Sequence, residues 1–195
     1  GDHRDLHRVD RRQRQMCIRD RLVGIEQGIV TGMALSLLLF IWRSAHPHTA
    51  ELGYLPERRV FMNVKRYPEA IRFKGVLILR IDSSLYFANM EFVGDQIRRY
   101  VAARPGLRWI ILDFSGVNEI DAVAVLELER LFEAYSETEV RFLLARVKGP
   151  VRDVFARAGW YERFGTEIEY PTVSAAINSL GTLRVDRSEP RDADT

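Results

Sequence analysis

The sequence has little cysteine and almost no excess of charge of either sign. It contains one Cys in 195 residues, which excludes a disulfide-stapled scaffold. Its 29 Lys and Arg face 27 Asp and Glu, and this net charge of +2 argues against a strongly basic nucleic-acid binder. With 47% hydrophobic residues, the chain is too apolar to be a disordered protein. Its length suits one domain of about 100–200 residues plus an attachment.

Residues 1–21 hold seven Arg and four Asp and lack the apolar periodicity of a helix face or a strand. Residues 11–20 (RRQRQMCIRD) resemble the translation of a transposase-based sequencing-library adapter. Residues 1–7 (GDHRDLH) resemble that of a flow-cell adapter, with residues 8–10 as a sample index between the two. We therefore expect residues 1–20 to be a sequencing artefact, residues 1–21 to be disordered, and the natural protein to extend further upstream.

A hydrophobic run over residues 22–42 contains one charge, Glu26. As a helix it would be about 31 Å long, which matches a hydrocarbon core of ~30 Å. Glu26 lies near one end of the run, so it costs less than the ~3 kcal/mol of a central charge. The sequence therefore predicts a transmembrane helix over residues 22–44, with Glu26 at the membrane interface. The length of the run and the lack of a convincing cleavage site argue against a signal peptide.

Small residues recur every four positions along this helix, at Gly24, Gly28, Gly32 and Ser36. This spacing places them on one helical face, where the backbone of another helix can approach closely. We expect this helix-packing face to meet neighbouring helices that the chain itself lacks.

Basic residues after the helix indicate its orientation. The positive-inside rule places the C-terminal domain in the cytoplasm. The charges that support this placement are Arg43, Arg58, Arg59, Lys65 and Arg66.

Residues 45–59 contain Pro and Gly among polar residues, a composition typical of a linker. His46 and His48 lie in this stretch, but two His without Cys or carboxylate partners at suitable spacing are weak support for a metal site. A domain is predicted over residues 60–181. The highly charged residues 182–195 are predicted to form a disordered tail.

Strand and helix patterns alternate within this domain. Apolar, β-branched runs predict strands at 60–64, 76–81 with a continuation at 85–88, 109–114, 140–144 and 167–170. Helical spacing predicts helices at 90–103, 121–136, 149–158 and 172–180. Asp121 is the expected N-cap of the second helix, on which Glu127, Glu129, Arg130 and Glu133 are expected to face water. The alternation predicts an α/β fold.

Two segments of the domain resemble a STAS domain: residues 86–89 (YFAN) before a helix, and residues 112–122 (LDFSGVNEIDA). Residues 22–47, with their ending LLLFIWRS, resemble the last transmembrane helix of a SulP-family anion transporter. Residues 63–68 (NVKRYP) resemble that family's entry into its STAS domain. The resemblance covers about residues 22–180. It implies a STAS-like mixed β-sheet packed with helices, preceded by one transmembrane helix.

The resemblance also implies a function. The chain would be the cytoplasmic regulatory STAS domain and final helix of a multi-pass secondary transporter of inorganic anions such as sulfate, in the inner (plasma) membrane of a bacterium. Implied partners are the membrane, the transmembrane helices of the missing transporter domain, a second copy in a homodimer, and a cytosolic protein or nucleotide ligand. A membrane-tethered STAS interaction module without transport activity, similar to an anti-sigma-factor antagonist, is the alternative.

The junction between the loop and the helix holds the candidate regulatory or ligand-binding residues Asp113, Ser115, Asp121 and Ala122. Ala122 stands where anti-sigma-factor antagonists of the STAS family carry a phosphorylatable Ser, so this position offers no hydroxyl for kinase-driven switching. Helix N-termini can bind anions, but this loop lacks a Gly-rich phosphate cradle, and Asp121 would repel phosphate.

Three carboxylates, Asp82, Asp113 and Asp121, are candidates for catalysis. Caps and turns explain them more simply, because no Ser-His, Cys-His or metal-ligand set accompanies them. We expect no enzymatic activity, no cofactor, no metal and no nucleic-acid partner.

The adapter interpretation makes a direct prediction about the gene. Long reads across the locus should show residue 22 preceded by coding sequence for further hydrophobic spans, and not by codons for residues 1–20. The tethered-module alternative predicts a start codon just before Leu22 instead. A continuous genomic reading frame that encodes residues 1–20 would contradict the adapter interpretation.

Overall fold

The computed structural model describes residues 6–165 and 169–181, with side chains from residue 24 onward. It divides into two compact units, residues 1–44 and 45–195. Each unit is described by itself. The predicted disordered tail, residues 182–195, lies outside the described residues.

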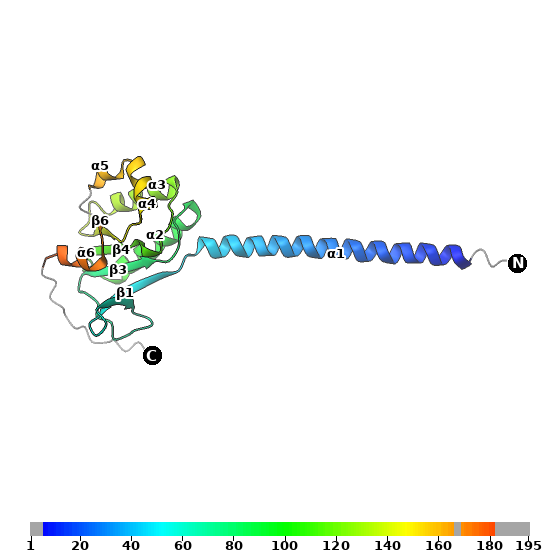
Figure 1. Ribbon diagram of the computed structural model, residues 1–195, viewed down its shortest axis with the longest axis horizontal. Coiled ribbons are helices and arrows are strands. Elements are labelled where there is room, and N and C mark those ends of the chain that lie inside the picture. The colour runs from blue at the N-terminus through cyan, green and yellow to red at the C-terminus, as the bar shows by residue number, and fades with distance from the viewer. Residues whose placement is uncertain (1–5, 166–168, 182–195) are drawn as a thin grey trace. The chain divides into compact units, whose positions relative to one another are not determined.

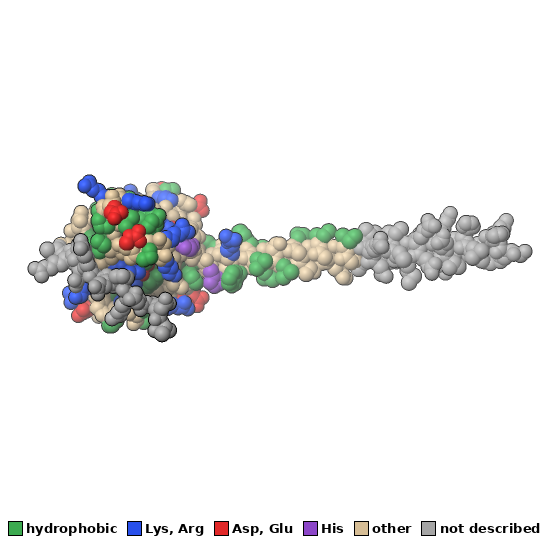
Figure 2. All heavy atoms as spheres, turned by 90° about the horizontal axis from the view of Figure 1, so that it is seen from below, with side chains coloured by type: hydrophobic (Ala, Val, Ile, Leu, Met, Phe, Trp, Pro, Cys, Tyr) green, Lys and Arg blue, Asp and Glu red, His purple; other side chains and the backbone are tan. Residues whose placement is uncertain are grey.

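The first unit is formed by helix α1 (Leu6–Ala45), which is 40 residues long. Its segment Gly24–Ala45 has 22 residues, which is about 33 Å at ~1.5 Å per residue and enough to cross a membrane. None of this segment is buried, and Leu39 and Phe40 are 66% and 69% exposed. Figure 2 shows hydrophobic side chains along the described part of the helix. Such a surface favours lipid over water.

Helical backbone begins at Leu6, whereas the sequence analysis expected disorder over residues 1–21. Residues 1–5 lie outside the described part of the chain. The physical reason for the extension is cooperativity: once a helix has formed, each added residue gains one hydrogen bond without a new nucleation cost. Arg, which occurs seven times upstream of residue 22, and the two Gln there also have good helix propensity.

The second unit is built on one six-stranded sheet with the order β2-β1-β3-β4-β5-β6. Strand β1 is antiparallel to β2 and β3, while β3 to β6 are mutually parallel. The sheet is therefore mixed, as predicted. Its strands are β1 (Thr49–Leu55), β2 (Val60–Asn63), β3 (Val76–Ile81), β4 (Trp109–Asp113), β5 (Arg141–Ala145) and β6 (Glu169–Tyr170).

Helices cover both faces of the sheet (Figure 1). Alternate residues of the parallel strands point to opposite sides and divide the core into two clusters. Leu77, Leu79, Ile110 and Leu112 belong to the larger cluster, with α2 (Phe87–Ala103), α3 (Ala122–Ala134), α4 (Gly149–Arg157) and α5 (Trp160–Phe164). Val76, Ile78, Ile111 and Leu143 belong to the smaller cluster, with β1 and α6 (Val173–Ser179).

The predicted linker over residues 45–59 is wrong for its middle part, because Thr49–Leu55 is strand β1. The strand is mostly buried, so the domain begins before residue 60. The strand was not recognised from the sequence because it contains Glu51, and a charged residue is not expected within a buried strand. It is tolerated because its carboxylate accepts hydrogen bonds from Arg72 Nε at 3.2 Å and Arg104 Nη2 at 2.7 Å.

Strand character was also wrongly expected at residues 85–88, because α2 begins at Phe87. The buried Asn89 accounts for this early start. Its Oδ1 accepts from Tyr86 N at 3.1 Å, and its Nδ2 donates to Ser84 O at 2.9 Å. These bonds satisfy backbone groups at the helix start. Leu85 contributes only an isolated bridge to Ile120.

Glu129 on α3 was expected to face water, but it is only 4% exposed. Its Oε2 accepts from Arg163 Nη1 at 2.7 Å, and Arg163 Nη2 also donates to Glu133 at 2.6 Å. Arg163 lies on α5, which has five residues and is too short to show a helical period in the sequence. The same helix buries Trp160 completely, with its ring stacked on Phe155 at 4.6 Å between centroids.

Gly116 allows the chain after β4 to pass close to the end of β3. A Cβ on Gly116 would lie 2.7 Å from Asp82 Cα and closer still to Ile81 O, both backbone atoms that cannot rotate away. We expect Gly116→Ala to lower the free energy of unfolding by about 1–3 kcal/mol, as for other overpacked sites.

Gly149→Ala is the matched control, because nothing lies within 4 Å of a Cβ at that position in α4. It should be neutral or stabilising by up to about 1 kcal/mol, since Ala is the better helix former. Urea unfolding of both variants in detergent, followed by circular dichroism, measures the difference. Equal stability of the two variants would contradict the close backbone approach.

Candidate functional site

The parallel strands bring their carboxyl ends to one edge of the sheet, and charged side chains gather there. In sheets of this kind, ligands commonly bind at this edge. The candidate regulatory loop leaves the edge from β4 and leads to α3. Asp113 is the last residue of β4, Ser115 lies in the short 3-10 helix η1 (Phe114–Gly116), Asp121 caps α3, and Ala122 is its first residue.

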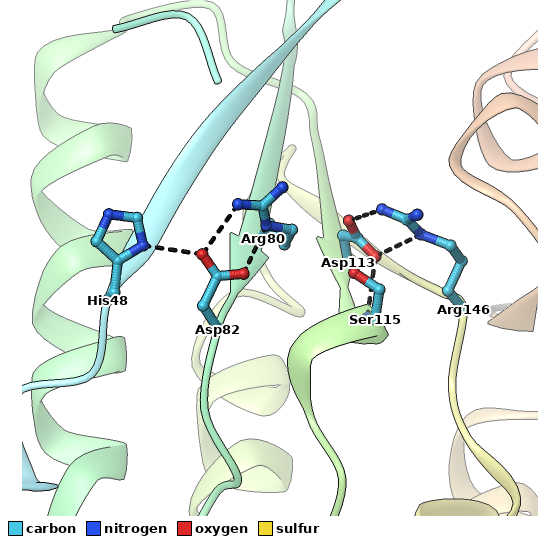
Figure 3. Close-up of polar contacts among 6 residues, drawn as sticks. All are labelled: His48, Arg80, Asp82, Asp113, Ser115 and Arg146. Atoms are coloured by element: carbon cyan, nitrogen blue, oxygen red, sulfur yellow. Dashed lines mark hydrogen bonds and ion pairs between the residues drawn. The ribbon is translucent and has the colours of Figure 1, made fainter. Parts of the chain in front are cut away.

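Asp113 is fully buried and forms an ion pair with Arg146, the residue after β5 (Figure 3). Arg146 Nε donates to Asp113 Oδ1 at 2.8 Å, and Arg146 Nη2 donates to Asp113 Oδ2. Ser115 N also donates to Asp113 Oδ1, at 3.1 Å. The carboxylate therefore holds the start of the loop and the end of the neighbouring strand together. A charge buried in this way depends on its partners.

Arg146 was not anticipated from the sequence. It adopts a left-handed backbone conformation with φ of 59°, which few non-Gly residues adopt. Its ion pair with Asp113 spans 33 residues and depends on the register in which Asp113 lies beside Ala145. No local pattern in the sequence carries this information.

Asp121 joins the two large helices at their N-termini. Its Oδ1 accepts from Ala124 N at 2.6 Å, which confirms it as the N-cap of α3. Its Oδ2 accepts from Phe87 N at 3.1 Å, in the first turn of α2. Two backbone bonds strengthen this junction: Leu85 N donates to Glu119 O at 2.9 Å, and Asp121 N donates to Leu85 O at 3.1 Å.

The four predicted site residues thus fall into two groups. Asp113 and Ser115 share a hydrogen bond at the buried start of the loop, while Asp121 and Ala122 lie at its end. The carboxylate of Asp113 is in an ion pair with Arg146, and that of Asp121 caps α3. Between the two groups, Asn118 and Glu119 are exposed, as is Ala122. The surface that the loop offers to a ligand is therefore made of these exposed residues.

A second polar group lies at the end of β3, beside the first (Figure 3). Arg80 Nε donates to Asp82 Oδ1 at 2.6 Å, and Arg80 Nη2 donates to Asp82 Oδ2 at 3.0 Å. His48 Nδ1 lies 2.8 Å from Asp82 Oδ2. Partial burial by itself would raise the pKa of Asp82, but the hydrogen bonds from Arg80 and His48 outweigh burial and lower that pKa. Asp82 is thus an ion-pair residue.

These arrangements suit binding better than catalysis. Each of the three candidate carboxylates is held by a cap or an Arg partner. Among the described residues, no group of three or more His, Cys, Asp or Glu is placed to hold a metal ion. Exposed loop residues over a rigid, hydrogen-bonded base are typical of recognition surfaces.

Proteins of known family have sequences similar to that of this chain. A family model described as the STAS domain matches residues 67–176. Sulfate transporter 4.1, chloroplastic, of Arabidopsis thaliana is 37% identical over 164 residues, which cover 79% of this chain and 24% of the relative. A probable sulfate transporter of Mycobacterium tuberculosis is 29% identical over 159 residues, which cover 81% of this chain and 28% of that protein. The chain therefore spans about a quarter of the length of these relatives.

Solved structures agree on the fold. The murine Solute Carrier 26 family member A9 anion transporter, in its inward-facing state, matches with a TM-score of 0.69 and 24% identity over 78% of this chain and 25% of that chain. A structure of SLC26A9 gives a TM-score of 0.66 at 22% identity, over 78% of this chain and 27% of that chain.

The STAS model matches more than half of the chain, and the described domain has a mixed sheet whose strands, helices and capped loop fall within or next to that match. The chain therefore belongs to the STAS domain family and has sulfate transporters among its homologues.

Proposed function

We propose that the chain is the C-terminal part of a SulP-type secondary transporter of inorganic anions such as sulfate. It would contribute the final transmembrane helix and the regulatory STAS domain. The observation that carries this proposal is the order of an apolar helix followed directly by a STAS domain. The similarity to sulfate transporters covers 79% of the chain, which is longer than the matched segment 67–176, so it extends beyond the domain core.

The charges around the helix support a cytoplasmic position for the domain. Arg43 lies in the last turn of α1, and further basic residues follow at 58, 59, 65 and 66. An excess of Lys and Arg near one end of a spanning helix favours retention of that end in the cytoplasm. The membrane would then be the plasma membrane, which is the inner membrane in a bacterium.

The small-residue face of α1 supports packing against other transmembrane helices. A Cβ at Gly24, Gly28 or Gly32 would meet nothing within 4 Å, so this face is uncovered within the described chain. Small side chains let helix backbones approach closely in a membrane, where packing and not hydrophobicity drives association. We propose the helices of the transporter domain as the partners, in a protein that forms a homodimer.

The role proposed for the domain is regulation through binding. The exposed part of the loop, at residues 118, 119 and 122, is the proposed contact for a cytosolic protein or a nucleotide. Ala122 has no hydroxyl, so regulation through this loop would not proceed by phosphorylation of that residue. No catalytic step is proposed.

The membrane-spanning role can be tested by placing charges in the middle of the helix. Replacing Leu37 and Leu38 with Arg should abolish insertion, because each central Arg costs about 3 kcal/mol relative to Leu. The matched control replaces both residues with Ala and should still insert. Retention in the membrane pellet after alkaline carbonate extraction measures insertion. Alkaline phosphatase fused to the C-terminus should stay inactive in the inserted chain, and activity there would contradict the orientation.

The transport role is tested with the complete gene. Liposomes that contain the full-length protein should take up radiolabelled sulfate, while residues 22–195 alone should not, because one helix cannot enclose a pathway for an anion. Selenate and chloride, tested as competitors, define the anion class. Sulfate uptake by residues 22–195 alone would contradict the proposal. A complete gene with a single hydrophobic span would instead support the tethered interaction module.

A further inference from the structure

A pocket of about 410 Å³ lies at the carboxyl edge of the sheet, on the side of β1 and β2, and no residue of the loop at residues 113–122 is part of its lining. Its polar lining consists of His48, Asn63, Arg66, Tyr67, Arg80 and Asp82. The size is within the usual range for small-ligand sites, about 300–1,000 Å³.

The pocket carries an excess of positive charge. Its one carboxylate, Asp82, forms an ion pair with Arg80, which largely offsets the negative charge. Arg66 is exposed and makes no ion pair with the other described residues, 24–165 and 169–181. The guanidinium of Arg66 is therefore the uncompensated charge of the pocket, and it favours an anionic ligand.

Three other lining side chains, those of Asn63, Tyr67 and Arg80, offer hydrogen-bond donors. The Oδ1 of Asn63 accepts from Lys65 N at 2.8 Å, which leaves its NH₂ group to donate. Arg80 uses Nε and Nη2 for Asp82 and retains Nη1. Tyr67 adds a hydroxyl at the pocket wall. A set of donors that includes two Arg matches the oxygens of a phosphate or sulfate group, which accept several charge-assisted hydrogen bonds.

We propose that this pocket binds a phosphate- or sulfate-type oxyanion group, with Arg66 as the main charged contact and Asn63, Tyr67 and Arg80 as donors. Asp82 does not oppose such a ligand in the way a free carboxylate would, because its charge is offset by the ion pair with Arg80. None of the four residues proposed for the regulatory loop lines this pocket.

The oxyanion has two available sources. One is free sulfate or phosphate in the cytosol. The other is the headgroup of an anionic phospholipid, since His48 is three residues after the last residue of α1, and three residues of extended chain span at most about 11 Å. The lipid source rests on the proposed function, in which α1 spans the membrane, whereas the free-anion source does not.

The experiment uses the full chain in nanodiscs of phosphatidylcholine, which carries no net charge. Sodium sulfate or phosphate is added at constant ionic strength against chloride, and side-chain NMR signals of Arg66 and His48 are followed. In a second arm, part of the lipid is replaced by phosphatidylglycerol without added oxyanion. We expect saturable shifts of these signals in at least one arm. Saturation in the first arm identifies a free oxyanion, and a response only in the second identifies a lipid headgroup.

Variants distinguish binding in the pocket from general attraction of anions to a basic surface. Arg66→Gln should weaken binding about tenfold or more, the effect of losing one charge-assisted hydrogen bond. Lys65→Gln removes the same charge from the neighbouring exposed residue, which does not line the pocket, and should change affinity less than about twofold. Tyr67→Phe keeps the ring that lies beneath Arg58 and removes only the hydroxyl, so it should weaken binding several-fold without unfolding.

Two results would overturn the proposal. One is the absence of saturable shifts in both arms. The other is an equal loss of affinity in Arg66→Gln and Lys65→Gln, which would show diffuse attraction to a basic surface. A chain that fails to insert in carbonate extraction can still be titrated with sulfate in detergent micelles, so failure of the membrane role and failure of this site give different results.

Discussion

Strand β4 lies in the middle of the sheet, and its residues from Ile110 to Asp113 are completely shielded from solvent. Without water, their backbone N–H and C=O groups must be paired within the protein, and β3 and β5 provide this pairing from both sides. Because both neighbours are parallel to β4, the chain must cross over the sheet between strands, and α2 and α3 make these crossovers. The parallel pairing of this buried strand thus accounts for two of the helices that pack on the larger core.

The same constraint gathers the polar chemistry of the domain at one edge. Parallel strands end on the same side of the sheet. Asp82 directly follows β3, Asp113 is the last residue of β4, and Arg146 directly follows β5, so the three lie near one another (Figure 3). Asp113 is the one charged residue within β4, and its burial is compatible with the fold because Arg146 neutralises it. The proposed regulatory loop therefore starts at a buried ion pair, and its middle residues Asn118 and Glu119 are exposed.

The antiparallel pairing of β1 with β3 decides where the domain begins. Thr49 lies beside Ile81, so the chain enters the domain at the edge that carries these charged groups. This pairing also brings His48 to Asp82 and forms the pocket with Arg66. Helix α1 exposes its large apolar side chains, whereas the domain buries most of its own. The surface of the helix therefore favours lipid, and that of the domain favours water. A long apolar helix joined to a domain with a buried core is the arrangement that the proposed transporter role requires.

Much of the fold was predictable from the sequence because its signals are local. The apolar runs of β3, β4 and β5, the N-cap Asp121 and the long hydrophobic helix each follow from neighbouring residues, and the STAS resemblance was carried by short contiguous motifs. Strand β1 was missed because Glu51 interrupts its apolar pattern and is compensated by Arg72 and Arg104, which lie far along the chain. Glu129 was misjudged for the same reason, since Arg163 on α5 neutralises it.

The sequence by itself therefore determined which segments form the buried strands and the membrane-type helix, because hydrophobic burial and helix capping act over a few residues. Only the tertiary structure decided which charges are paired and which remain for a ligand. Arg146 reaches Asp113, and Arg66 is left uncompensated, through strand register and chain crossovers that bring together residues tens of positions apart. Electrostatic pairing depends on these distances in space, and no local pattern of residues encodes them.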